Sequence, residues 1–68
     1  MKYPVVFERA PRNWSAYVPD LPGCIAAAKT KAETRKLIRE AIEFHLEGMR
    51  EAGEPIPEPG TYVELVEV

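Results

Sequence analysis

Alternation of apolar and polar positions predicts three short β-strands in the first half of the chain. In residues 2–9 the odd positions up to Phe7 are apolar, which is typical of a strand with one buried face. Residues 14–18 are rich in aromatic and β-preferring types, and the turn-forming stretch 10–13 before them predicts an antiparallel hairpin. Residues 24–29 follow a turn rich in proline and glycine and are predicted to form a third strand, although their three alanines are also compatible with a helix.

A single long helix is the clearest prediction after these strands. Thr30 and Glu33 have the spacing of a capping box, in which the hydroxyl accepts from the N–H of Glu33 and the carboxylate accepts from the N–H of Thr30. The helix should therefore begin at Lys31. No proline interrupts it before about Ala52, and Gly53 supplies a stop, so it runs for roughly six turns.

The end of the chain predicts one more strand. Residues 53–60 form a proline-stiffened connection, and residues 61–68 have the composition of a strand. The predicted order is β-β-β-α-β, with one long helix packed on a mainly antiparallel sheet, which is an α+β fold. No repeat or long linker divides residues 1–68, so they are predicted to form a single domain.

The apolar face of the predicted helix is wider than one sheet requires. It spans roughly 200°, whereas packing on one sheet needs a stripe of about 100° or somewhat more. We expect the extra width to contact a second protein surface, from another copy of the chain or from a different protein. The stripe is centred on Ile38, Ala41, Ile42, His45 and Met49, and one of its flanks carries Leu37, Phe44 and Gly48.

The stretch PDLPGC contains the residues that most invite a chemical interpretation. Pro22 and Gly23 suit the middle positions of a type II turn, because proline fixes φ and glycine accepts a positive φ. Cys24 would need a base to act as a nucleophile, and His45 is the only histidine of the chain. A cysteine that opens a strand of small apolar residues is usually buried and inert. We therefore interpret the stretch as a structural corner whose exposed rim contacts a partner.

His45 lies in the middle of the apolar stripe and has two interpretations. It is either covered by protein and satisfied by a local partner, or an interface residue whose protonation weakens association below about pH 6.5. One histidine and one cysteine do not supply the four ligands of structural zinc, and the carboxylates show no two-metal pattern. No glycine-rich phosphate loop is present. The sequence predicts no catalytic residue, no metal and no cofactor.

Composition narrows the classes of function. A chain of 68 residues with 46% hydrophobic and 29% charged residues should fold, but its core is small enough to favour association. A net charge of −2 does not indicate the basic surface that nucleic-acid-binding proteins use to contact phosphates. No apolar run suits a membrane span or a signal peptide, and a single cysteine suits a reducing compartment, so the cytoplasm is expected. The chain has seven prolines and no glutamine, a composition that is more common in proteins from thermophiles.

Two runs, YVPDLPGCIAAAKT and AETRKLIREAIEFHLEGMREAGEPIPEP, together with the two-stranded lead-in, resemble the HicB-like antitoxin family over nearly the whole chain. The resemblance implies a partial RNase H-like fold without the catalytic carboxylates. It also implies a type II toxin–antitoxin role, in which the domain binds a small HicA-type mRNA-cleaving toxin with a double-stranded-RNA-binding fold and occludes its active surface. Such a toxin should be basic, which suits an acidic partner.

The sequence departs from the family pattern at two points. Many full-length members append a C-terminal DNA-binding module, whereas this chain ends at Val68 directly after the last predicted strand. No such module is therefore predicted, and autorepression is not carried over. The family commonly has glycine before the residue that caps the helix, where this chain has AAAKT, so a different shape is expected at that crossing.

The sequence thus predicts a non-enzymatic, antitoxin-like interaction module that forms a homo-oligomer, either a dimer or a tetramer. The alternatives are an orphan homo-oligomeric protein and a small hydrolase or nuclease relic that uses Cys24 with His45 or the scattered carboxylates. The predicted contact residues are Asp20, Leu21, Pro22, Gly23, Cys24, Leu37, Phe44 and Gly48, with His45 as a pH-sensitive interface residue.

Overall fold

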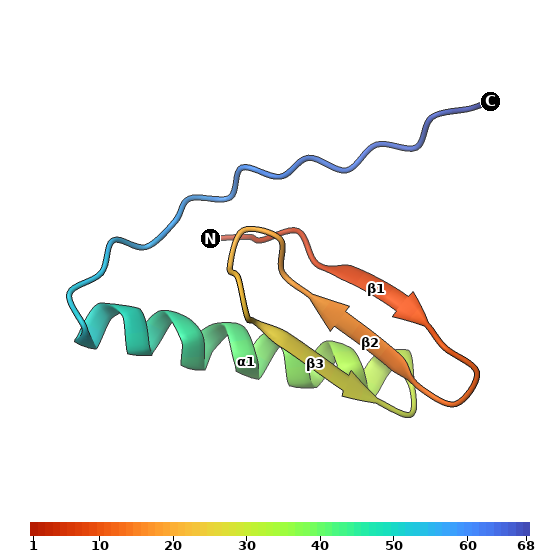
Figure 1. The fold of residues 1–68 in the computed structure, drawn as a ribbon, viewed down its shortest axis with the longest axis horizontal. Helices are drawn as coiled ribbons and strands as arrows, with labels where there is room; N and C mark the ends of the chain where they lie inside the picture. Colours follow the sequence, from red (N-terminus) through yellow and green to blue (C-terminus); the bar gives the residue numbers. More distant parts are fainter.

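The computed structural model describes residues 1–68 and contains three strands followed by one helix. The strands form one antiparallel sheet in the order β1-β2-β3, and α1 lies against it, packing mainly on β2 and β3. This arrangement confirms the predicted α+β fold class. In chain order the elements are β1 (Val6–Arg9), β2 (Trp14–Tyr17), β3 (Ile25–Ala28) and α1 (Lys31–Glu51) (Figure 1).

Small side chains on the inner face of the sheet allow the helix to approach closely. Ala16 lies in the middle of the sheet, opposite Phe7 on one side and Ala26 on the other. Alanine leaves room above the strand, and Ile38 of α1 belongs to the same buried cluster as Ala16. Only six residues are buried, so the core is small even for a chain of this length. The buried residues are Ala16, Val18, Leu21, Cys24, Thr34 and Ile38.

The corner between β2 and β3 is a type II turn, as predicted. Cys24 N donates to Leu21 O at 3.0 Å, and Gly23 has a φ of 85°. Only glycine adopts this backbone conformation without strain, because any Cβ would crowd the neighbouring carbonyl. Val18 N donates to Cys24 O at 3.1 Å, so the two strands are joined at the base of the turn.

The helix begins and ends where the sequence predicts. Thr30 is its N-cap, and the hydroxyl accepts from Glu33 N at 3.1 Å. The Glu33 carboxylate does not complete the predicted box with the Thr30 N–H; it accepts from the Thr30 hydroxyl at 3.1 Å instead. At the other end, Gly53 has a φ of 72° and donates to Arg50 O, and Glu54 N donates to Met49 O. These two bonds form a Schellman motif that satisfies the last carbonyl groups.

The predicted last strand is wrong for the single chain. Residues 61–68 run extended, but they belong to no sheet, and Figure 1 shows them leaving the domain beside the N-terminal stretch. Strand-forming composition alone does not make a strand, because the backbone N–H and C=O groups need a neighbouring strand to pair with. This chain offers no such neighbour to the segment. The observed order is therefore β-β-β-α followed by an extended segment.

Candidate interaction surface

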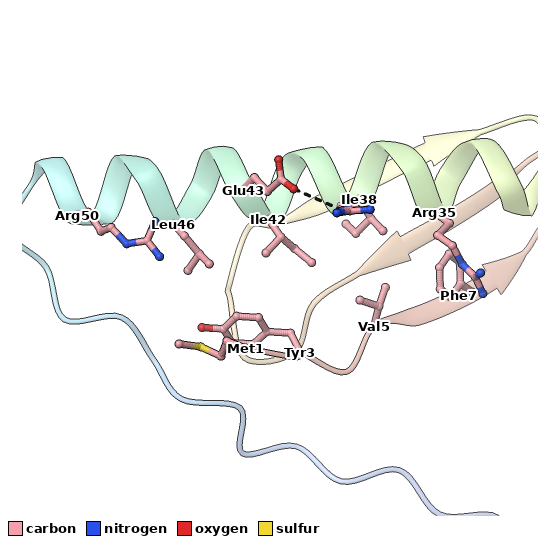
Figure 2. Close-up of a pocket in the computed structure, with 11 residues that line it drawn as sticks. Met1, Tyr3, Val5, Phe7, Arg35, Ile38, Ile42, Glu43, Leu46 and Arg50 are labelled. Carbon is pink, nitrogen blue, oxygen red and sulfur yellow. Dashed lines mark ion pairs between the residues drawn. The ribbon is translucent and has the colours of Figure 1, made fainter.

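An apolar groove of about 490 Å³ runs between α1 and the stretch that leads into β1. It exists because α1 packs mainly on β2 and β3, so the side of the helix above β1 is left uncovered. Figure 2 shows side chains from the two elements pointing toward one another across this space. The apolar walls consist of Met1, Tyr3, Val5 and Phe7 on one side and Ile38, Ile42 and Leu46 on the other.

The rim of the groove is positively charged. Arg35, Arg39 and Arg50 of α1 line it, and Glu43 is the only acidic residue among the lining residues. Glu43 is paired with Arg39, at 3.4 Å between Oε1 and Nε, and both side chains are exposed. Lys31 adds a further cation, with its Nζ 5.4 Å from the centre of the Phe7 ring. An apolar floor with a cationic rim suits an occupant that combines apolar side chains with carboxylates.

The opposite flank of α1 is exposed and has the opposite charge. Phe44 is 80% exposed and Leu37 is 43% exposed, and Gly48 is also on the surface. Exposed glutamates stand at neighbouring helical positions, so the flank is acidic around its apolar centre. We call this surface the acidic flank, and it consists of Leu37, Phe44, Gly48, Glu40, Glu47 and Glu51.

The corner residues divide into three groups. Leu21 and Cys24 belong to the buried core, because the turn directs both side chains under the helix. A partner contact at these two residues stays a prediction. Asp20 is half-buried and engaged within the chain. Pro22 and Gly23 are exposed and are the part of the corner that a partner can reach.

The carboxylate of Asp20 binds the start of the C-terminal segment. Its oxygens accept hydrogen bonds from Gly60 N at 3.3 Å, Thr61 N at 3.4 Å and the Thr61 hydroxyl at 3.0 Å. Nearby, the Tyr3 hydroxyl donates to Pro57 O. Together these contacts fix the proline-rich connection against the corner. Local sequence gives no signal for them, since the partners are about 40 residues apart.

Cys24 and His45 are not joined by a hydrogen bond. Burial raises the pKa of the Cys24 thiol, so the sulfur stays protonated and is a poor nucleophile. His45 is half-buried, and its ring makes no hydrogen bond within the chain. No three of the His, Cys, Asp and Glu side chains come together as metal ligands.

The cationic rim was not among the features inferred from the sequence, although a signal for it exists. Arg35, Arg39 and Arg50 fall within a narrow sector when the helix is placed at 100° per residue. Hydrophobic periodicity predicts the wide apolar stripe, whereas the different charges on its two sides follow from the positions of the arginines and glutamates around the helix. The groove with its cationic rim and the acidic flank are therefore distinguished by their charge and not by the width of the apolar stripe.

These features define a small α+β interaction domain, with an apolar groove on one side of its helix and an acidic flank on the other. A family model described as the HicB-like antitoxin of bacterial toxin–antitoxin systems matches residues 3–67. The chain therefore belongs to the HicB-like antitoxin family, and the resemblance seen in the sequence is confirmed.

Two curated relatives show how far the similarity extends. The chain is 42% identical over 57 residues to an uncharacterized 14.9 kDa protein from the rep–hol intergenic region of Haemophilus phage HP1, covering 84% of this chain and 43% of the phage protein. It is 38% identical over 58 residues to UPF0150 protein Ta0767 of Thermoplasma acidophilum, covering 84% of each. The chain thus spans less than half the length of the phage relative.

A solved structure extends the similarity to three dimensions. The chain is similar to a chain of the HicA3 and HicB3 toxin–antitoxin complex, with a TM-score of 0.73 and 32% identity, over 88% of this chain and 70% of that chain. Fold and family together make this protein an antitoxin-like interaction module. α1 does not combine the length and the apolar character that a membrane-spanning helix needs.

Proposed function

We propose that this chain binds a HicA-type toxin and occludes the toxin's active surface, without catalysing a reaction itself. The observation that carries the proposal is the similarity, in both fold and sequence, to a chain of a solved HicA3 and HicB3 complex. The single thiol suits a reducing compartment, so the encounter is proposed to occur in the cytoplasm.

The acidic flank is the surface that suits such a toxin. A toxin that cleaves mRNA needs a basic surface to hold the phosphate backbone. Phe44 supplies a large exposed apolar side chain, and aromatic anchors of this kind carry much of the binding energy of protein interfaces. Glu40 and Glu47, one turn away on each side, supply the charges that steer a basic partner. The exposed rim at Pro22 and Gly23 is proposed as a further contact.

The test measures RNA cleavage by a purified HicA-type toxin from the same genome, with and without this chain. We expect a molar excess of the chain to stop cleavage. Phe44→Ala should weaken inhibition about tenfold or more, because truncating an interface anchor costs about 2 kcal/mol. Ile25→Ala is the matched control, since Ile25 is a 70% exposed apolar residue on a strand. Undiminished cleavage in the presence of excess unmodified chain would overturn the proposal.

We also propose that the chain forms a homo-oligomer, a dimer or a tetramer. The small core supports this proposal, and so does the amount of apolar surface that the single chain leaves exposed. An orphan homo-oligomeric protein without a toxin is the second candidate function, and the cleavage assay distinguishes it from an antitoxin. The likeness to a partial RNase H-like fold stays a prediction that rests on the family resemblance.

A further inference from the structure

We propose that two copies of this chain exchange their C-terminal segments, with residues 61–68 of each copy pairing as a strand beside β1 of the other and covering its groove. The inference rests on the homo-oligomer proposed above and assigns its interface. It does not depend on a toxin, because the acidic flank lies on the other side of α1.

Residues 61–68 have the composition of a strand and run extended, but they pair with no other strand in the single chain. Tyr62 is 93% exposed and Leu65 is 98% exposed, and the three valines of the segment are exposed as well. Apolar, β-branched and aromatic residues of this kind favour paired strands, and a soluble protein seldom leaves so continuous an apolar stretch in water. The segment therefore needs an edge to pair with.

β1 supplies a free edge. It pairs only with β2, so one row of its backbone N–H and C=O groups is unpaired. A fourth strand on that side would lie under the uncovered side of α1, where its inward side chains would fill the groove against Ile38 and Ile42. Pairing at this edge thus satisfies backbone groups and closes the apolar groove in a single step.

The charges of segment and groove are complementary. The segment carries Glu64 and Glu67 and no basic residue. The groove rim carries three arginines against one glutamate. Glu64 and Glu67 are three positions apart, so they lie on opposite faces of a strand. One of the two therefore faces α1 and its cationic rim, where the opposite charges help to fix register and partner.

The segment that pairs with β1 must come from a second copy. The first residues of a chain's own segment are held in a position that directs the segment away from the β1 of the same chain. The Asp20 carboxylate holds Gly60 and Thr61 against the corner. From that point the segment and β1 diverge, as Figure 1 shows. In a dimer with two-fold symmetry, each copy gives one segment and receives one. Neither a segment nor a groove is then left unoccupied.

The exposed area is large enough for a stable dimer. A folded monomer of this mass has a surface of about 4300 Å², whereas this chain exposes 5652 Å². The excess of about 1300 Å² is more than the roughly 800 Å² per partner that a standard interface buries. The radius of gyration of 13.2 Å likewise exceeds the value of about 11 Å expected for a compact chain of this length.

The experiment makes two measurements on the full chain. Light scattering gives the mass in solution, and a refolded mixture of ¹³C-labelled and unlabelled chains gives isotope-filtered NOEs that arise only between copies. We expect a dimer mass and inter-copy NOEs from Val63, Leu65 or Val66 to the rings of Tyr3 or Phe7. A monomer, or NOEs from the segment to β1 only within one copy, would overturn the exchange. A dimer whose contacts lie elsewhere would overturn the exchange but not the homo-oligomer.

Two proline variants test the pairing without removing any part of the chain. Val63→Pro and Glu64→Pro change adjacent residues, whose N–H groups point to opposite sides of a strand. One of the two therefore removes a hydrogen bond to β1 and should weaken dimerisation about tenfold or more. The other removes an outward N–H and should change it by less than about threefold. Equal effects of the two variants contradict pairing at one edge.

Discussion

Thr34 is the only polar residue in the core, and replacing it by valine tests how the helix is fixed to the sheet. Its side chain is fully buried, and its hydroxyl lies 2.8 Å from the carbonyl oxygen of Thr30 and 3.3 Å from that of Trp14. A single hydroxyl hydrogen serves both acceptors, one at the N-cap of α1 and one on β2. Thr34→Val keeps the shape of the side chain and removes this hydrogen.

The expected cost follows from what remains after the substitution. Thr30 O keeps its bond from Thr34 N at 3.0 Å, so only Trp14 O loses the donor that the helix provides. Loss of one such bond costs about 1 kcal/mol. A chain of this length has a total stability of about 3–10 kcal/mol, and 1 kcal/mol lowers Tm by about 4–8 °C. Thr34→Ala also removes buried carbon and should cost about 1.5 kcal/mol more.

The assay is thermal and urea unfolding followed by circular dichroism. All variants must be compared at one protein concentration, because association shifts the apparent stability. A Thr34→Val variant with the midpoint of the unmodified chain would refute the reasoning, since it would show that the hydroxyl contributes nothing between helix and sheet. Equal midpoints for the valine and alanine variants would show that packing around Thr34 is unimportant.

Two further predictions concern the N-cap and the buried thiol. Thr30→Ala should cost about 1 kcal/mol through the lost cap, measured by the same unfolding assay, and an unchanged midpoint would show that the Thr30–Glu33 contact does not stabilise α1. Burial raises the pKa of the Cys24 thiol, so the folded chain holds the thiol proton more tightly than the unfolded chain does. The free energy of unfolding should therefore fall as pH rises above about 9, where the unfolded chain loses this proton first. Cys24→Ala should flatten the alkaline part of the stability profile, and an identical slope in both proteins would contradict the assignment.

Local chemistry explains which parts of the fold the sequence predicts correctly. The helix start at Thr30, the helix stop at Gly53 and the type II turn at Gly23 each depend on residues a few positions apart. Such contacts form in nearly the same way whatever the rest of the chain does. The three strands were also predicted, because alternation and turn residues are local signals.

Contacts between distant residues explain what the sequence did not predict. Residues 61–68 have the composition of a strand, but pairing depends on an edge that the chain itself does not place beside them. The sequence gives no signal that the Asp20 carboxylate binds Gly60 and Thr61. The groove depends on where α1 crosses the sheet, and hydrophobic periodicity gives the apolar width of a helix but not that position.

The two sides of α1 differ in charge, and this difference separates the two proposed partners. A segment that carries Glu64 and Glu67 is attracted to the cationic rim of the groove and repelled by the acidic flank. A basic toxin has the opposite preference. If both proposals hold, the exchange of segments should not compete with toxin binding, and a dimer would present two acidic flanks at once. Since both contacts use exposed charges, added salt should slow the association of each, while the apolar contacts of the groove at Ile38 and Ile42 should hold the dimer together after the charges are screened.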